Sequence, residues 1–233
     1  MKKYRNEWKY YCRQGDLAVL EQRFGSLLDL DEHTGESGIY EIHSLYFDDY
    51  RDSCAWDNDV GTDVRFKYRI RYYGTDLGTL HLERKEKLHG LCRKLSCRLT
   101  VEQYKQILEG DAAELFWETD NDLLRRFCKD VMAYGFAPKV IVDYQRTAFV
   151  EPISNVRITL DQNITASNAI SSFLEPDYMT YPLLEPGMHI LEVKFDDVLP
   201  GQLKRCLCED YLVQTAFSKY YLCRNLIHHL GSY

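Results

Sequence analysis

The sequence predicts an α+β fold, an antiparallel β-barrel of eight strands with helices packed on its outside. Apolar and polar residues alternate in eight segments, short polar turns join several of these segments, and helical patterning is confined to a few separate stretches. Short turns favour antiparallel hairpins over parallel crossover units. A closed or nearly closed barrel would remove the exposed edges of such a sheet.

The predicted strands are rich in Tyr, Val and Ile. They span residues 5–12, 39–47, 64–73, 79–87, 91–99, 139–150, 155–162 and 188–196. Segment 164–187 contains Pro176, Pro182 and Pro186, so we expect an irregular loop there.

Four helices are expected from capping signals and 3.6-residue periodicity. Thr100 and Gln103 form a capping box, and Gly110 is a stop signal for the same helix. The four helices are predicted from Asp16 to Leu28, from Thr100 to Gly110, from Asp120 or Asn121 to near Gly135, and over residues 203 to 230.

The composition indicates one globular domain over residues 1–233. Apolar residues make up 45% of the chain, and no repeat or linker interrupts it. There is no run of 18 apolar residues and no apolar segment after the basic start, which predicts a cytoplasmic protein without a membrane segment. The eight cysteines are scattered, which favours free thiols over disulfides or a zinc site.

Positive charge is concentrated in one part of the chain. The net charge of −7 argues against a general nucleic-acid binder. Residues 64–98 nevertheless contain ten Lys/Arg and only three Asp/Glu.

Alternation aligns the charged residues of several strands on one face. One face of segment 65–72 consists of Arg65, Lys67, Arg69 and Arg71. Similar sets are His81, Glu83 and Lys85; Tyr144 and Arg146; Arg157, Thr159 and Asp161; and Glu192 and Lys194. For a single strand, such a face could simply be solvated. Its recurrence in several strands indicates a shared basic surface.

An enclosed basic cluster requires an anionic partner. Two cations 4 Å apart repel by about 4 kcal/mol at an effective dielectric constant near 20. A phosphate chain supplies the needed charge, and a carboxylate among the cations could hold Mg²⁺ or Mn²⁺ beside it. Alternatively, Glu83 and Asp161 could serve only as structural ion pairs. The sequence contains no P-loop, dinucleotide-binding glycine motif or nucleophile elbow.

The order of these motifs resembles the polyphosphate polymerase domain of the vacuolar transporter chaperone (VTC) complex and its bacterial relatives, in the triphosphate tunnel metalloenzyme superfamily. The resemblance spans nearly the whole chain. It rests on Glu7-x-Lys9-Tyr10, Ser44 to Asp48, Arg69-x-Arg71, Leu82 to Lys85, Asp143-Tyr144-x-Arg146, Arg157-x-Thr159-x-Asp161, Leu191 to Lys194 and Phe217 to Tyr220.

This resemblance implies particular roles for the residues at the matching positions. As catalytic contacts it implies Arg69, Arg71, Lys85, Arg146, Arg157 and Lys219, and as substrate-binding residues Lys9, Lys94, Tyr144, Lys194 and Ser218. Glu83, from the charged face of its strand, is also expected at the substrate-binding site. Glu192 matches the metal-binding glutamate, whose ion would be Mn²⁺ or Mg²⁺. Arg93 could face inward in place of Lys94, because a one-residue slip would exchange the two.

The resemblance also implies an activity, transfer of the γ-phosphoryl group of ATP to inorganic polyphosphate. The superfamily's triphosphatase and cyclase branch begins with E-x-E-x-K, whereas this chain has Arg5-Asn6-Glu7-Trp8-Lys9, which favours the polymerase branch. Two alternatives remain open. One is a tripolyphosphate or nucleoside triphosphate hydrolase, with Glu7 or Glu83 orienting water, and the other is a non-catalytic polyphosphate-binding module.

Overall fold

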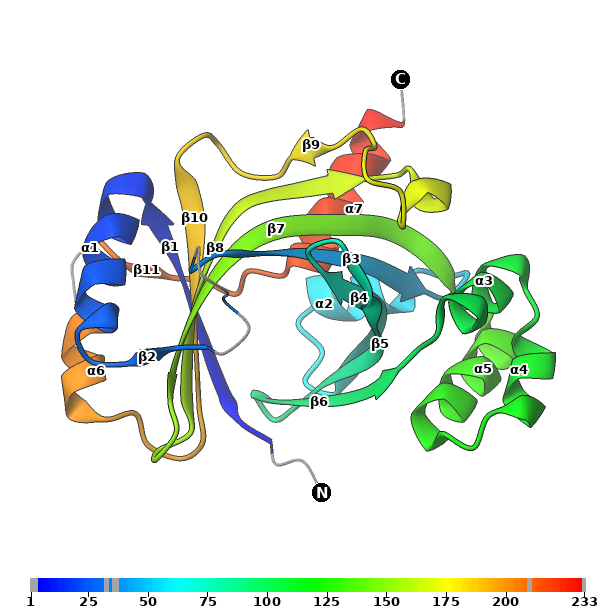
Figure 1. The fold of residues 1–233 in the computed structure, drawn as a ribbon, viewed down its shortest axis with the longest axis horizontal. Helices are drawn as coiled ribbons and strands as arrows, with labels where there is room; N and C mark the ends of the chain where they lie inside the picture. Colours follow the sequence, from blue (N-terminus) through cyan, green and yellow to red (C-terminus); the bar gives the residue numbers. More distant parts are fainter. Residues whose placement is uncertain (1–3, 32–33, 35–37, 209–210, 232–233) are drawn as a thin grey trace.

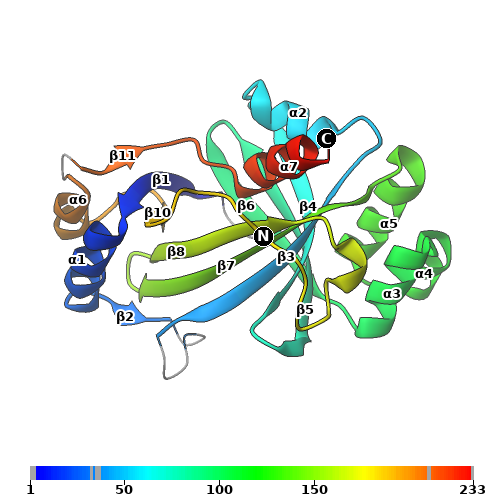
Figure 2. The ribbon, with the colours of Figure 1, turned by 90° about the horizontal axis from the view of Figure 1, so that it is seen from above.

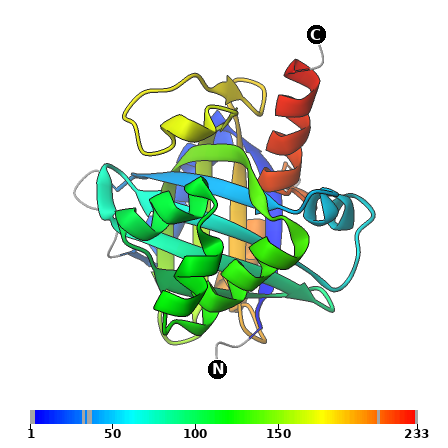
Figure 3. The ribbon, with the colours of Figure 1, turned by 90° about the vertical axis from the view of Figure 1, so that its right-hand side faces the viewer.

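The computed structural model describes residues 4–31, 34, 38–208 and 211–231. Within these residues the chain forms seven α-helices and one antiparallel sheet of eleven strands. The sheet curves strongly, so that its faces become an inside and an outside (Figures 1 and 3).

The eight predicted strands are all present. They are β1 (Asn6–Arg13), β3 (Tyr40–Asp48), β4 (Arg65–Tyr73), β5 (Asp76–Leu88), β6 (Leu91–Arg98), β7 (Ala137–Glu151), β8 (Val156–Ser167) and β10 (Met188–Phe195). Three two-residue strands were not predicted, namely β2 (Asp29–Leu30), β9 (Tyr181–Pro182) and β11 (Val213–Gln214).

The prediction of a closed eight-stranded barrel is wrong in strand number and in closure. The hydrogen-bonded order is β11-β1-β10-β8-β7-β3-β4-β5-β6, with β2 and β9 as short additions to β7 and β8. The strands β1 and β6 do not form a ladder, and β11 pairs with Tyr10 and Tyr11 at the free edge of β1. A single bridge between Arg5 and Cys92 joins β1 and β6, with N–O distances of 2.9 and 2.8 Å.

The helix starts predicted at Thr100 and at Asp120 or Asn121 agree with the structure, whereas α1 begins at Gln14, so the predicted cap Asp16 lies in its first turn. The observed helices are α1 (Gln14–Gly25), α2 (Ser53–Asp59), α3 (Val101–Glu109), α4 (Ala112–Glu118), α5 (Asp122–Tyr134), α6 (Gly201–Leu207) and α7 (Lys219–Leu230). The capping box of Thr100 and Gln103 is formed, and Gly110 ends α3 in the left-handed region. The short helices α2 and α4 were not predicted.

The single helix predicted over residues 203–230 is wrong. The structure has two helices there, α6 and α7, and β11 lies between them as an extended pair with β1. Residues 209 and 210 of that prediction lie outside the described residues. The loop predicted over 164–187 is partly regular, because β8 continues to Ser167 and β9 pairs with it.

The apolar side chains lie outside the curved sheet, in two clusters. One cluster packs β3, β4, β5 and β7 against α3, α4 and α5, and includes Tyr68, Ile70 and Phe127. The other packs β1, β8 and β10 against α1 and α6, and includes Leu20 and Leu191. These helix groups lie at opposite ends of the molecule (Figures 1 and 2). The inside of the sheet is left to the polar face of each strand.

Candidate functional site

A polar cavity of about 490 Å³ lies inside the curved sheet. Its walls are formed by β1, β3 to β8, β10 and the start of α7. Twelve of the thirteen predicted site residues line it: Lys9, Arg69, Arg71, Lys85, Lys94, Tyr144, Arg146, Arg157, Glu192, Lys194, Ser218 and Lys219. Residues distant in sequence therefore meet as the alternation predicted, while their roles remain predictions.

The lining is strongly cationic. Among the described residues, twelve Lys or Arg line the cavity but only three Asp or Glu. Two further carboxylates, Glu83 and Asp161, lie behind the wall, where they bind several of these cations. The carboxylates therefore cannot balance the positive charge, and the cavity favours a multiply charged anion.

Glu83 is the predicted residue that does not line the cavity. It is 1% exposed, and its carboxylate accepts hydrogen bonds from Arg69 Nε (2.6 Å) and Lys94 Nζ (2.5 Å). Burial alone would raise the pKa of Glu83, but Arg69, Arg71 and Lys94 outweigh it and hold the pKa well below its usual value. This geometry favours the ion-pair alternative, in which Glu83 orients cations from behind.

Asp161 is the second buried carboxylate that binds cations from behind the cavity wall. It is fully buried, accepts a two-point contact from Arg146 (2.6 and 2.8 Å) and also binds Lys219 Nζ at 2.5 Å. Burial would raise the pKa of Asp161, yet Arg146 and Lys219 lower it to about 2. Lys219 is itself only 8% exposed, so α7 places this lysine in the wall and not on the helix surface.

Hydroxyl groups orient two further arginines. Arg71 donates from Nε to Ser44 Oγ (3.0 Å) and from Nη2 to Tyr144 OH (2.7 Å). Arg157 donates to Tyr40 OH at 3.1 Å and forms an ion pair with Asp31 at 2.7 Å. Fixed guanidinium groups of this kind suit phosphate oxygens, which they can bind through two parallel bonds.

Glu7 and Glu192 are carboxylates that face the cavity directly. Lys9 lies 3.4 Å from Glu7 and 3.8 Å from Glu192, and Lys194 contacts both of them as well. Lys85 donates to both oxygens of Glu7 at 2.8 Å. Burial would raise the pKa of each glutamate, and Glu192 also raises that of Glu7, but the lysines hold both pKa values low.

This pair of ionised carboxylates fits a divalent metal. No group of three or more His, Cys, Asp or Glu side chains suited to a metal ion occurs in the described part of the chain. Mg²⁺ usually takes only one or two carboxylates and completes its shell with water and substrate phosphates. Glu192, with Glu7 beside it, could hold such an ion next to a bound phosphate chain.

The ambiguity between Arg93 and Lys94 is resolved by their partners. Lys94 reaches the inner carboxylate of Glu83, whereas Arg93 binds Glu86 through Nε at 2.9 Å. Strand β6 pairs Lys94 with Lys85, another inward residue. The side chain of Lys94 therefore lies on the inner face of β6, although Arg93 also lines part of the cavity.

Lys67, Tyr46 and Tyr40 also line the cavity but were absent from the predicted site. Alternation had placed Lys67 on the inner face of its strand, and that signal was sufficient to find it. The two tyrosines lie on β3. Tyr46 falls within the motif Ser44 to Asp48, but neither tyrosine was assigned a role in the site. Tyr46 OH accepts from Arg69 Nη1 at 2.9 Å.

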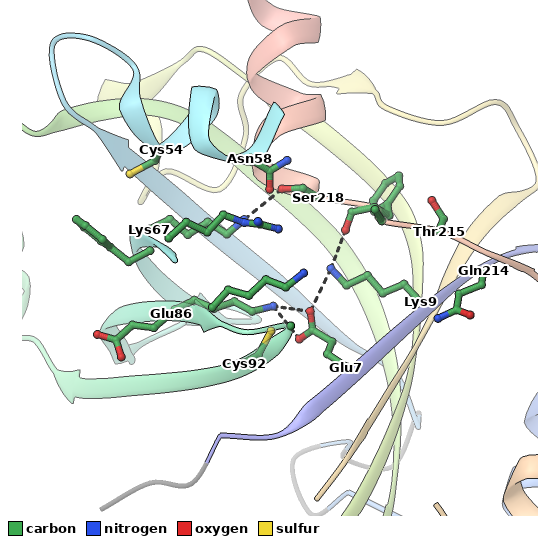
Figure 4. Close-up of a pocket in the computed structure, with 17 residues that line it drawn as sticks. Glu7, Lys9, Cys54, Asn58, Lys67, Glu86, Cys92, Gln214, Thr215 and Ser218 are labelled. Atoms are coloured by element: carbon green, nitrogen blue, oxygen red, sulfur yellow. Dashed lines mark hydrogen bonds and ion pairs between the residues drawn. The ribbon is translucent and has the colours of Figure 1, made fainter. Parts of the chain in front are cut away.

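A second cavity, of about 480 Å³, shares part of its lining with the first. Figure 4 shows the residues that line this second cavity. It extends toward α2 and the segment 214–218. Six residues line both cavities and define what we call the neck: Glu7, Lys9, Lys67, Lys85, Cys92 and Ser218. The two cavities therefore meet at residues that include Ser218, the N-cap of α7.

The fold and site define a class of protein in which a curved antiparallel sheet surrounds a cationic cavity with two carboxylates. A sequence profile of the VTC domain matches residues 4–228. The chain belongs to the VTC domain family. The resemblance inferred from the motifs is thereby confirmed, whereas the roles of the individual residues are not tested by it.

Other comparisons are more distant. No curated protein matches the chain. Among solved structures, the PH1819 protein from Pyrococcus horikoshii OT3 has a TM-score of 0.48 and 14% identity, covering 97% of this chain and 99% of that one. A candidate adenylate cyclase from Bacillus halodurans has a TM-score of 0.49 and 13% identity, covering 85% and 82%. We base no functional argument on similarities this low.

No helix in the described part of the chain has the length and apolar character needed to cross a membrane.

Proposed function

We propose that the protein is a metal-dependent polyphosphate polymerase that uses ATP as phosphoryl donor. The observation that supports this most directly is the cavity lining, in which twelve Lys or Arg face three Asp or Glu. A chain of phosphates can contact many such cations at once, because each of its units is charged. Membership of the VTC domain family agrees with this ligand.

The proposed reaction is an in-line phosphoryl transfer. A terminal oxygen of the polyphosphate chain forms a bond to the γ-phosphorus, and the bond between that phosphorus and the β,γ-bridging oxygen breaks. Its electron pair leaves with ADP. The attacking oxygen is already ionised near neutral pH, so no protein base is required.

Most of the proposed catalysis is positioning and charge stabilisation. Arg69, Arg71, Arg146 and Arg157 would hold donor phosphates and neutralise the equatorial oxygens of the transferred group. Lys85 and Lys219 would add point charges, while Lys9, Lys94, Lys194, Tyr144 and Ser218 would bind the rest of the chain. A divalent ion at Glu192 would supply further neutralisation of phosphate charge when bound.

Of the two carboxylates considered for the hydrolase alternative, Glu7 and Glu83, only Glu7 lines the cavity. Glu7 faces the cavity and could orient a water molecule, whereas Glu83 lies behind the wall and is saturated by cations. Glu7 is held by three lysines, which keep it ionised but occupy its oxygens. This arrangement favours a role for Glu7 in balancing the charge of the lysines over a role in orienting water. It therefore favours the polymerase over the hydrolase.

The products distinguish the three candidate functions. The protein is incubated with ATP and Mn²⁺, ADP is quantified, and polyphosphate is separated from free phosphate on a gel. Polyphosphate in proportion to ADP supports the polymerase. Free phosphate in its place indicates hydrolysis, and tight binding of polyphosphate without ADP release indicates a binding module; either result contradicts the proposal.

A further inference from the structure

Lys67 differs from the other two lysines of the neck in its partners. Lys85 and Lys9 both contact the carboxylate of Glu7, and Lys9 also donates to the carbonyl of Phe217 at 2.7 Å. Among the described residues Lys67 has no carboxylate within 4.0 Å; its ammonium donates to Ser218 Oγ at 3.1 Å (Figure 4). An ammonium group has three donors, so two of them remain for a ligand.

Ser218 complements this lysine. Its oxygen accepts from Lys67 and from the backbone N–H of Tyr221 at 3.4 Å, as the N-cap of α7. A hydroxyl has two acceptor positions and one donor hydrogen. Neither contact uses the hydroxyl hydrogen of Ser218, which is therefore available to a ligand. Lys67 and Ser218 thus both have a donor available at the neck.

The start of α7 adds to the positive potential at this point. The helix has twelve residues and no acidic residue in its first turn. A helix N-terminus favours anions through its unpaired N–H groups and its dipole. Near Lys67 the neck thus combines an ammonium group, a hydroxyl donor and a helix terminus.

We infer that Lys67 and Ser218 form an additional phosphate-binding subsite at the neck between the two cavities, separate from the arginines of the main cavity. Its ligand is one phosphate group of a chain whose neighbouring phosphates occupy the main cavity. The identity of that chain rests on the proposed function, but the subsite itself requires only an anion with several phosphate-type oxygens.

The surroundings of Lys67 make this subsite sensitive to pH. Burial lowers the pKa of Lys67 to about 8, and Lys85, Lys9 and Arg69 act in the same direction, while Tyr46 opposes them. Cys54 of α2 and the ring of Tyr220, 5.7 Å away, complete its surroundings. A phosphate beside Lys67 would raise its pKa. Affinity due to Lys67 is therefore full below pH 8 and decreases as the pH rises above that value.

Tyr46 contributes to the same pH range and must be separated from Lys67. Burial would raise the pKa of Tyr46, but Arg69 and Lys67 lower it to about 8. Its deprotonation places a negative charge near the neck and also weakens anion binding. Lys67→Arg removes the titration of residue 67, because arginine stays charged. Tyr46→Phe removes the titration of residue 46, together with the hydrogen bond from Arg69 and the effect of Tyr46 that raises the pKa of Lys67.

Calorimetric titration with inorganic tripolyphosphate tests the subsite without requiring turnover. At pH 7, Lys67→Gln should weaken binding by about 10- to 100-fold, the usual effect of a lost charged hydrogen-bond donor. Lys105→Gln, on the exposed surface of α3, makes the same charge change as a control. Affinity of Lys67→Gln within twofold of wild type, with an unchanged thermal unfolding curve, would overturn the subsite.

The pH series tests the second part of the inference. Between pH 7 and 9 the wild-type protein should lose more affinity than Lys67→Arg, while Tyr46→Phe should keep the loss that is due to Lys67. Titration of the ligand itself is common to all these proteins. A Lys67→Arg protein as pH-dependent as wild type would overturn the role of Lys67 protonation. Failure of the polymerase assay would leave these binding results intact.

Discussion

The assignment of Glu192 as the metal ligand can be tested by one conservative substitution. Glu192→Gln keeps the size of the side chain but removes the charge that a hard divalent cation requires. Mn²⁺-dependent turnover should fall by on the order of 100-fold or more. Tripolyphosphate affinity should fall less, because the arginines and lysines remain.

The appropriate control is Glu185→Gln, which removes the same charge from an exposed position. Turnover and Mn²⁺ binding are measured for both variants, together with their circular dichroism spectra. A folded Glu192→Gln protein that retains wild-type turnover would remove Glu192 from the metal site.

Lys219 is buried in the cavity wall, unlike an ordinary lysine on the exposed face of a helix. Lys219→Ala should cost about 2 to 4 kcal/mol of transition-state stabilisation, the loss expected for one preorganised charge contact. Metal binding should survive, because Glu192 is not a partner of Lys219 in any ion pair of the described residues.

ADP release and polyphosphate formation, measured together, test this value. Lys129→Ala provides a matched control, as an exposed lysine within another helix, α5. Because Arg146 still binds Asp161, the variant should fold. Turnover equal to that of wild type would show that Lys219 only neutralises Asp161.

At this scale the sequence predicted which face each residue occupies but not which partners it finds. Glu83 and Lys85 share a face of β5, yet one lies behind the wall and the other lines the cavity. The difference arises from side-chain direction and from the neighbours on β4 and β6. Alternation contains no information on either.

The contribution of the outer helices to stability can be tested by substituting their N-cap residues. Thr100 accepts from Gln103 N at 3.1 Å at the start of α3, and the Gln103 side chain in turn accepts from Thr100 N. Thr100→Ala should lower the free energy of unfolding by about 1 kcal/mol. Urea denaturation measures this loss, with the exposed turn residue Thr75→Ala as control.

Tripolyphosphate affinity should be unchanged in Thr100→Ala, because α3 packs on the outside of the sheet. A large loss of affinity with unchanged stability would contradict the separation of the outer helices from the cavity.

Strands were easier to predict than helices because their signal is local. Period-two alternation was sufficient for all eight long strands. The break between α6 and α7 was missed because Val213 and Gln214 are extended only by pairing with Tyr10 and Tyr11 of β1. Whether the sheet closes depends in the same way on contacts between the two ends of its strand order, which no single segment encodes.

Ligand binding should stabilise the whole molecule. The uncompensated cations repel one another across the cavity, and a phosphate chain relieves that repulsion. At 100 times its dissociation constant, tripolyphosphate should add about 2.7 kcal/mol to the free energy of unfolding. Thermal unfolding with and without ligand measures the gain.

Salt provides the control for this gain. At a fixed ligand concentration the rise in melting temperature should shrink between 50 and 500 mM NaCl, because screening weakens charge-driven binding. A melting temperature that does not change at saturating tripolyphosphate, or a shift unaffected by salt, would contradict the cationic cavity as the binding site.

The alternation along β4 has a consequence for how such a protein can change over evolution. Lys67, Arg69 and Arg71 line the cavity, whereas Tyr68 and Ile70 are buried in the outer core. The odd-numbered positions of this strand thus contribute to ligand selectivity, and the even-numbered positions contribute to stability. Mutations at the odd positions can explore new anions while the even positions preserve the scaffold, so a lineage could acquire new substrates without first having to acquire a new core.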